Sequence, residues 1–486
     1  MMTLNKDETL PVAAGLHELF FPRSIAHIGA SPKPAPGRFA FLEYIQKMGY
    51  EGALYPVNPS YREMLGLVCF PDLASIPGPV DMAILALPAA MSVAILRQAP
   101  RGKVKFVVIH TSGFSEIDKG YLEDELIELG KAKGFRMIGP NCMGVFNRRA
   151  KICFWNDHAE LADRPGSVGW ISQSGGLALT LMSRAIDLGI GIEKAVSLGN
   201  QIDVSIAETM EYFAEDEAIR VIAAYVEDVK DGRRFLETVR RITPQKPVLV
   251  WKGGVTAVGR DAARTHTGSM AGNAEIFAAA LRQAGAVRID NHDQMLIALK
   301  VLERPDRLPG RNLLLVCPGG GMVVNVSDAF SAQPNLSLPR LSPECQARLQ
   351  EMVPQENVDL KNPVDPGAVG MTKLGKIIET AGREPDIDSV LTIGNADFLQ
   401  MLPNDQVREL VIQEMVHTVS SSAKAIEKPF YFYIMPVHDD PVSALYRRLL
   451  RQRLEDQGVP CLGGPYYEIA RVFSRLAGIQ RRADPQ

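Results

Sequence analysis

The chain has 486 residues, of which 46% are hydrophobic and 22% charged, and its formal net charge is −3. This length predicts two or three domains, and the near-neutral charge gives no electrostatic argument for nucleic acid or an anionic membrane surface as a partner. The sequence has no apolar run near the roughly 20 residues of a membrane span, no signal-peptide pattern and no Cys-x-x-Cys pair among its six cysteines, so we expect a cytoplasmic protein without a metal site.

The first section of the chain alternates strand-like and helix-like segments. Residues 24–31 are typical of a buried strand that ends in a tight turn, and a helix at 39–48 and a strand at 53–57 follow. Further strands are expected at 82–87, 104–110 and 137–138, each followed by a loop of turn residues. Ligands on a parallel sheet lie at the carboxyl ends of the strands, where all these loops would gather. The turn at 29–31 lacks a full Gly-x-Gly-x-x-Gly, so it does not identify the ligand by itself.

The second section opens after a loosened stretch at 147–166 and repeats the pattern of strand, glycine-rich turn and helix. A strand at 167–171 leads into the turn 172–176 and a helix at 177–187, so exposed N–H groups can hold an anion. We expect Asp203 to cap a helix at 204–213, and a strand at 221–226 to end at Glu227. The turn at 172–176 and Glu227 fall at the carboxyl ends of predicted parallel strands, as does the histidine described next, and all three can converge on one site.

A loop with one histidine follows the next strand, at 247–251. Small residues and glycines surround His266 between residues 260 and 272, so we expect a mobile loop and an uncrowded imidazole that more than one partner can reach. A helix at 293–302 closes this section. The third section carries strands at 313–317, 389–393 and 430–434, and we interpret its glycine run at 319–321 as a strand-to-helix turn.

The three sections predict an α/β protein of three doubly wound Rossmann-like or flavodoxin-like domains with parallel sheets. We place the domains at residues 1–147, 148–302 and 311–486, with linkers where turn residues gather. Glu227, His266 and the turn at 174–176 would share one edge of the second domain.

Taken together, these motifs resemble the α-type chain of the ADP-forming (NDP-forming) acyl-CoA synthetases, relatives of succinyl-CoA ligase. The resemblance extends from about Phe20 to Ala477. The stretches that carry it are Ile-Gly-Ala-Ser31, Tyr-Pro-Val-Asn-Pro59, Ile-Gly-Pro-Asn-Cys-Met-Gly144, Ser-Gln-Ser-Gly-Gly176, Ser-Leu-Gly-Asn200, Tyr-Val-Glu227 and Thr-His-Thr-Gly-Ser-Met-Ala-Gly272. In that family the first domain binds coenzyme A, the second carries a transiently phosphorylated histidine, and a third α/β domain follows.

The resemblance assigns roles to particular residues. His266 matches the phosphorylated histidine, and Glu227 matches the glutamate that steadies it. The phosphoryl group would meet the N–H groups of Ser174, Gly175 and Gly176. Coenzyme A would lie across the loops that hold Gly29, Ala30, Ser31, Val57, Asn58, Pro59, Leu87, Pro88, Ser112, Gly113, Asn141 and Cys142. We interpret Cys142 as packing near the pantetheine end, since no paired base is near it in sequence.

The resemblance also implies a partner. The ATP-grasp module that phosphorylates the histidine has no room after Ala477, so we expect a separate ATP-grasp β-type subunit that holds ATP or ADP and Mg²⁺, in a hetero-oligomer such as α2β2. The substrate would be a small carboxylic acid that the sequence does not define.

Two other classes of function stay open. A dinucleotide-dependent oxidoreductase would have a similar first domain, although the acid expected to bind the ribose after the second strand is replaced by residues 57–59. A non-catalytic coenzyme A-binding regulatory protein would retain His266 as a vestige.

Overall fold

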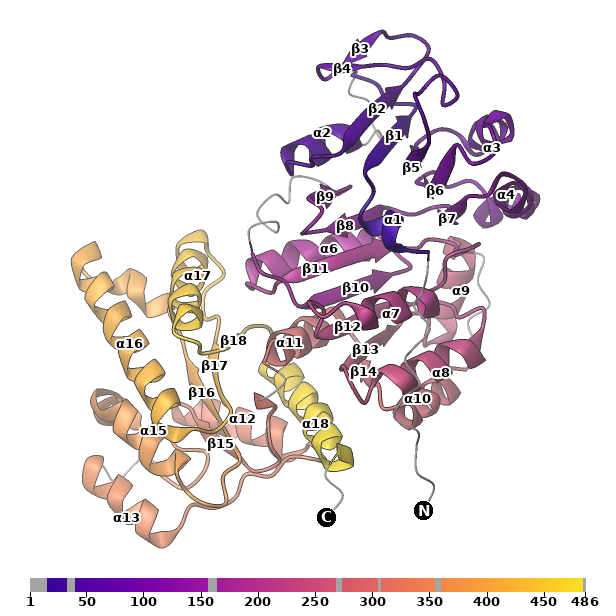
Figure 1. The fold of residues 1–486 in the computed structure, drawn as a ribbon. Helices are drawn as coiled ribbons and strands as arrows, with labels where there is room; N and C mark the ends of the chain where they lie inside the picture. Colours follow the sequence, from indigo (N-terminus) through magenta and orange to yellow (C-terminus); the bar gives the residue numbers. More distant parts are fainter. Residues whose placement is uncertain are drawn as a thin grey trace. The chain divides into compact units, whose positions relative to one another are not determined.

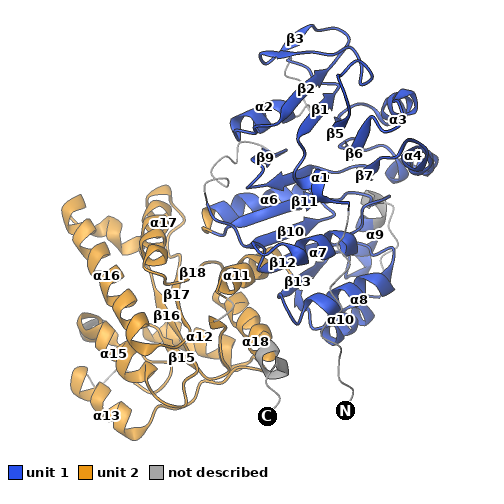
Figure 2. Cartoon of the chain, in the orientation of Figure 1, with its two compact units in different colours: residues 1–186, 190–290 blue, residues 187–189, 291–486 orange. Residues whose placement is uncertain are grey.

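The computed structural model describes residues 15–32, 40–155, 164–267, 273–304, 307–354 and 360–483 (Figure 1). Residue contacts divide the chain into two compact units (Figure 2). Unit 1 comprises Met1–Ile186 and Ile190–Asp290, and unit 2 comprises Asp187–Gly189 and Asn291–Gln486. Both units are built from mostly parallel sheets with helices, which confirms the predicted α/β fold class.

The first sheet of unit 1 is parallel, and its strand order is β2-β1-β5-β6-β7. Its strands are β1 (Ser24–Ile28), β2 (Ala53–Val57), β5 (Val80–Leu85), β6 (Val104–Ile109) and β7 (Arg136–Ile138). The chain passes from β1 to β2 on one side and then to β5 on the other. The strand order therefore reverses between β1 and β5, and the ends of these two strands are where such a sheet binds ligands.

Short helices cover this sheet, and a small hairpin extends from it. The helices are α1 (His17–Phe20), α2 (Phe41–Lys47), α3 (Ala89–Gln98), the 3-10 helix η1 (Ser115–Ile117) and α4 (Gly120–Lys133), and the antiparallel hairpin is β3 (Glu63–Met64) with β4 (Leu67–Val68). All six residues of β5 are buried, as expected for a central strand with helices on both faces.

The second sheet of unit 1 has the strand order β14-β13-β12-β10-β11-β8-β9. Its strands are β8 (Gly144–Asn147), β9 (Ile152–Cys153), β10 (Val168–Ser172), β11 (Ile192–Ser197), β12 (Val221–Val226), β13 (Val248–Lys252) and β14 (Val287–Ile289). All pairings among strands β10 to β14 are parallel. Strand β8 pairs antiparallel with β11 and with β9. The order reverses between β10 and β12, which gives this sheet its own ligand-binding edge.

The β8–β9 hairpin was not anticipated from the sequence, because each strand is very short. The domain limit expected at residue 147 falls at the end of β8, which already pairs with the second sheet. The three-domain limits stay a prediction. The helices of this section are α6 (Gly175–Asp187), α7 (Ile206–Glu215), α8 (Gly232–Ile242), α9 (Ala257–Thr267) and α10 (Ala274–Gln283).

Two local expectations in this section are wrong. The cap of α7 is Ser205, whose hydroxyl accepts the N–H of Glu208 at 3.2 Å. Asp203 instead accepts the backbone N–H of Met137 at 2.8 Å and pairs with Arg136. The spacing Ser-x-x-Glu is a helix-start pattern that outweighs an acid two residues earlier.

The second correction concerns the expected loop at 260–272. The backbone is helical through Thr267, so His266 lies in the last turn of α9. Alanine, arginine and aspartate at 260–264 permit this helix, and the Thr256 hydroxyl accepts the N–H of Gly259 at its start. The rest of the expected loop, residues 268–272, and the side chain of His266 lie outside the described residues.

Unit 2 is built on a parallel sheet whose strands follow one another in sequence, β15-β16-β17-β18. These are β15 (Leu313–Val316), β16 (Ser389–Gly394), β17 (Phe430–Ile434) and β18 (Cys461–Leu462). The short β18 was missed from the sequence. The 3-10 helices η3 (Met371–Lys373) and η4 (Asp397–Met401) and the short α14 (Gly367–Gly370) lie in the loops.

The helices of unit 2 fall into two groups. One group is α13 (Pro343–Met352), α15 (Leu374–Gly382), α16 (Asp405–Ile426) and α17 (Pro441–Asp456), and the other is α11 (His292–Leu302), α12 (Gly320–Ser331) and α18 (Tyr466–Ala483) (Figure 1). Contacts group α11 with α18 in unit 2, whereas the sequence placed it at the end of the second domain. None of the described helices combines the length and apolarity of a membrane span.

Candidate functional site

The reversal point of the second sheet brings Gln173 and Glu227 together. Gln173 directly follows β10, Glu227 directly follows β12, and these two strands are neighbours. The side-chain carbonyl of Gln173 accepts the backbone N–H of Glu227 and, at 2.9 Å, that of Asp228. Gln173 is only 4% exposed, so this amide holds the backbone at the end of β12 in one position.

The carboxylate of Glu227 is buried and incompletely satisfied. The residue is 6% exposed, and among the described residues the Oε2 atom has no hydrogen-bond partner. Lys252, at the end of β13, donates from Nζ to the main-chain carbonyl of Glu227 at 2.7 Å. Burial lowers the pKa of Lys252, and burial followed by the charge of Glu227 raises the pKa of Tyr225. A buried acceptor without a partner can take a hydrogen bond from an imidazole N–H.

The predicted anion-binding turn lies beside these residues. Helix α6 begins at Gly175, and the hydroxyl of Ser172 donates to the carbonyl of Ser174 at 2.7 Å. A Cβ on Gly175 would lie 2.4 Å from Cγ of Met143, so a larger residue there would have to displace the methionine side chain. The first turn of a helix carries N–H groups without helical partners and the positive end of the helix dipole, and both features favour an anion.

The structure therefore gathers Glu227 and the turn at 174–176 at one edge, and it fixes the backbone of His266 in α9, the helix that follows β13. Helix α9 also contacts η1, which follows β6 of the first sheet. The histidine-bearing helix thus lies against the first section of unit 1 as well as the second.

The predicted coenzyme A residues of the first three loops lie around the reversal point of the first sheet. Gly29 has a φ of +86° and donates its N–H to the carbonyl of Val57 at 3.0 Å. A Cβ on Gly29 would lie 2.6 Å from Cδ2 of Leu87. The side chain of Asn58 donates to the carbonyl of Ala30 at 2.8 Å. The remaining residues of these loops are Ser31, Pro59 and Pro88, the last of which directly precedes α3.

The other predicted residues of this edge follow β6 and β7. Asn141 donates its N–H to the carbonyl of Thr111 at 2.9 Å, next to Ser112 and Gly113. Cys142 is 2% exposed, and its thiol donates to the carbonyl of Ile109 at 3.3 Å. Burial raises the pKa of the Cys142 thiol to about 12, so it is not a nucleophile near neutral pH.

The two edges meet inside unit 1. The N–H of Asn200 donates to the carbonyl of Pro140 at 3.0 Å, and a Cβ on Gly199 would lie 2.1 Å from the same oxygen. The side chain of Asn200 donates to the hydroxyl of Ser115 and to the carboxylates of Glu116 and Glu123. The loop after β7 is therefore packed against the loop after β11.

Sequence reasoning missed three residues that build these edges. Gln173 and Asn200 belong to the motifs that end at Gly176 and Asn200. A motif does not predict which distant main-chain group the side chain will hydrogen-bond. Lys252 is the last residue of β13, and a lysine directly after an apolar run was the available signal for a charged group at the edge.

Comparisons with known proteins bear on this arrangement. A coenzyme A-binding domain family matches residues 23–148, and a succinyl-CoA ligase-like flavodoxin domain family matches residues 165–302. The α subunit of ADP-forming acetate–CoA ligase I of Pyrococcus furiosus is 34% identical over 411 residues, which are 82% of this chain and 86% of that protein. The chain belongs to the ADP-forming acyl-CoA ligase family. This membership confirms the resemblance drawn from the motifs.

Some members of the ligase family are longer than this chain. ADP-forming acetate–CoA ligase I of Archaeoglobus fulgidus is 33% identical over 393 residues, which are 79% of this chain but 56% of that protein. The chain therefore spans little more than half the length of this relative. A solved structure is also similar, that of an acetyl-coenzyme A synthetase 1 from Ca. Korarchaeum cryptofilum in complex with phosphate and ADP. The two chains share 27% identity with a TM-score of 0.79, and the match covers 96% of this chain and 97% of that chain.

Proposed function

We propose that this chain is the α-type chain of a cytoplasmic ADP-forming acid–CoA ligase, which binds coenzyme A and passes a phosphoryl group through His266. The observation that carries the proposal is the buried Glu227, whose carboxylate has an oxygen without a hydrogen-bond partner among the described residues. It lies at the reversal point of a sheet in a member of the ligase family, beside the start of α6.

A carboxylate does not react with a thiol directly because its leaving group is poor, so the acid is first converted into an acyl phosphate. The histidine divides this phosphoryl transfer into two steps. A neutral imidazole nitrogen of His266 attacks the terminal phosphorus of ATP, so that a P–N bond forms while the P–O bond to ADP breaks. The substrate carboxylate then attacks this phosphorus and forms an acyl phosphate, which releases the imidazole. Finally the thiol sulfur of coenzyme A, losing its proton, attacks the acyl carbon and expels inorganic phosphate.

Glu227 and the turn at 174–176 have separate tasks in these steps. The glutamate accepts the N–H of the second ring nitrogen and so keeps the first nitrogen free to attack. The N–H groups at the start of α6 stabilise the dianionic phosphoryl group on the histidine. Gln173 and Lys252 do not touch the reacting atoms. They hold the backbone of Glu227 from its N–H and from its carbonyl, which makes them positioning residues.

Coenzyme A binds, in this proposal, along the carboxyl edge of the first sheet. The family match at 23–148 supports this, as do the contacts among the loops after β1, β2 and β5. The meeting of this edge with the loop after β11 would bring the thiol towards the phosphoryl site. The oxidoreductase alternative has less support. Residues 57–59 replace the acid that would bind the ribose of a dinucleotide, and the family to which the chain belongs is one of ligases.

The phosphoryl donor would be ATP, held with Mg²⁺ by an ATP-grasp module. The chain aligns with 86% of the length of a relative that is named as an α subunit. This similarity supports a separate β-type partner in a hetero-oligomer. The acid would be a small carboxylic acid.

The test is phosphorylation by radiolabelled ATP in the presence of the ATP-grasp partner. The wild-type chain should gain an acid-labile, base-stable phosphoryl group. His266→Ala should lose both this label and acyl-CoA formation while it still binds coenzyme A. His438→Ala, at an exposed histidine of unit 2, is the matched control and should retain both. A wild-type label in the His266→Ala protein would refute the proposal. A wild-type chain that binds coenzyme A without being labelled would favour the regulatory alternative.

A further inference from the structure

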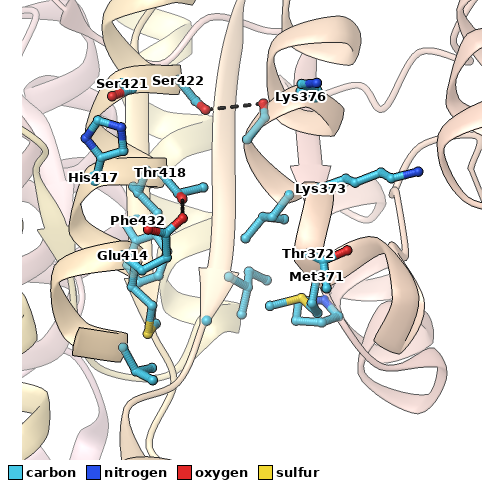
Figure 3. Close-up of a pocket in the computed structure, with 18 of the residues that line it drawn as sticks. Met371, Thr372, Lys373, Lys376, Glu414, His417, Thr418, Ser421, Ser422 and Phe432 are labelled. Carbon is cyan, nitrogen blue, oxygen red and sulfur yellow. Dashed lines mark hydrogen bonds between the residues drawn. The ribbon is translucent and has the colours of Figure 1, made fainter. Parts of the chain in front are cut away.

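Unit 2 contains a cavity of about 800 Å³ between α15 and α16 (Figure 3). It opens above the carboxyl ends of two adjacent parallel strands, since Pro318 follows β15 while Gly394 and Asn395 mark the end of β16. This is the edge of a parallel sheet where ligands bind, and the volume is within the range of small-molecule sites. No residue proposed for the ligase reaction lines it.

A close contact between the two helices closes one end of this cavity. The hydroxyl of Ser422 donates to the carbonyl of Gly375 at 3.2 Å (Figure 3). A Cβ on Gly375 would lie 3.3 Å from both Ser422 Oγ and Thr418 Cγ2. Because glycine permits this approach, the helices touch here, and the cavity occupies the space between them towards the strand ends.

The walls of the cavity are mainly apolar and include aromatic and thioether groups. The apolar lining residues include Leu374, Ile393, Phe398, Val411, Met415 and Phe432. Met371 also lines it, and Met371 and Phe398 keep 44% and 37% of their surface exposed. Together with the apolar wall, these two side chains extend the apolar surface at the cavity, and continuous apolar surface is a feature of ligand-binding grooves. Phenylalanine rings and methionine sulfurs both favour an aromatic guest.

The polar lining supplies hydrogen-bond acceptors without a surplus of positive charge. The hydroxyl of Thr418 donates to the carboxylate of Glu414 at 3.4 Å, so this pair presents acceptor lone pairs on the α16 wall. Among the permanently charged lining residues, the lysines at 373 and 376 are balanced by the glutamates at 379 and 414, and His417 also lines the cavity. The ammonium of Lys373 already donates to the carbonyl of Met352 at 2.9 Å. Nothing here favours a phosphate or another polyanion.

We propose that this cavity binds a neutral aromatic molecule with one hydrogen-bond donor, of the indole or phenol type. The ring packs among Phe398, Phe432 and Met415, and its N–H or O–H donates to Glu414 and Thr418. This site is independent of the phosphohistidine chemistry, because its lining residues belong to unit 2 alone.

The position of the site is tested by NMR of the full chain with ¹³C-methyl-labelled methionine. Added indole should shift the resonances of Met371 and Met415, assigned with Met371→Leu and Met415→Leu, and leave that of Met143 in unit 1 unchanged. Shifts elsewhere, or no shift at the solubility limit of indole, would overturn the proposal. This measurement needs no variant whose folding is in doubt.

Calorimetry with the same full chain tests the chemistry of the site. Met415→Trp fills the cavity and should weaken indole binding at least about ten-fold. Leu410→Trp adds the same bulk at an exposed position on α16 outside the lining, and should leave the affinity unchanged. Indole should bind more tightly than 1-methylindole, which lacks the donor, and Glu414→Met should remove this preference. Benzoate binding more tightly than indole would contradict a neutral guest.

Discussion

The backbone N–H of Glu227 donates to the side-chain carbonyl of Gln173. These residues are 54 positions apart in sequence, and they meet because β10 and β12 are neighbours at the point where the strand order reverses. The same carbonyl accepts the N–H of Asp228 at 2.9 Å. One buried amide therefore sets the position from which the Glu227 carboxylate can act.

Gln173→Ala removes the acceptor of two backbone N–H groups. We expect the free energy of unfolding to fall by about 1–3 kcal/mol, because buried donors would lose their partner. The rate of His266 phosphorylation should fall, while coenzyme A affinity stays at the wild-type value. Chemical denaturation, single-turnover labelling and calorimetry measure these three quantities.

The control for this variant is Gln245→Ala, at an exposed glutamine on the turn before β13. It should leave stability and labelling unchanged. If Gln173→Ala lost stability but kept the full labelling rate, the amide would be structural and would not position Glu227.

Glu227→Gln should slow histidine phosphorylation without abolishing it. The amide oxygen can still accept the ring N–H, but it lacks the charge that stabilises the imidazolium. The hydrogen-bond partner of a histidine's second nitrogen contributes about 10–100-fold in metal sites, and we expect a loss of about that size in the single-turnover rate here. Asp228→Asn, the same change at the next residue, is the control and should have a smaller effect. Equal rates for Glu227→Gln and wild type would remove Glu227 from the proposed mechanism.

Much of the fold was predictable because helix and strand signals alternate along the chain. The run Val221–Val226 is apolar, short and followed by acids, so both β12 and the place of Glu227 at its end could be predicted from the sequence. Strand order was not predictable, because it depends on packing between distant segments. The pairing of β10 with β12, and hence the contact from Gln173 to Glu227, needed the structure.

The misread segments show where local signals compete. Small residues around His266 indicated a loop, but alanine is also the best helix former, and the backbone is helical to Thr267. Asp203 had the chemistry of a helix cap but is engaged by Arg136 and Met137. Ser205 was free to cap α7. A tertiary contact therefore decided the role of Asp203, whereas local helix propensity accounts for α9.

Cys142 should resist alkylation in the native protein across neutral and moderately alkaline pH. Its pKa is raised to about 12 by burial, so the reactive thiolate fraction stays small until the pH approaches that value. In the unfolded chain the same thiol should titrate near 8.5 and react readily above it. Iodoacetamide labelling with peptide mapping, in buffer and in denaturant from pH 7 to 10, measures both. A native labelling rate that rises ten-fold per pH unit up to a plateau near pH 8.5 would show an ordinary, accessible thiol.

Gly199→Ala tests whether the two edges of unit 1 must be in contact. A Cβ at this position would lie 2.1 Å from the carbonyl oxygen of Pro140, a main-chain atom that cannot rotate away. Gly78→Ala is the matched control, since Gly78 has a similarly positive φ of +70° but no atom within 4 Å of the new Cβ. Both variants suffer backbone strain, and only the first also has the overlap. We expect Gly199→Ala to lose about 1–3 kcal/mol more of the free energy of unfolding than Gly78→Ala. Coenzyme A affinity should fall only in Gly199→Ala, because the displaced loop carries Asn141. Equal affinities in the two variants would separate the loop after β7 from the coenzyme A site.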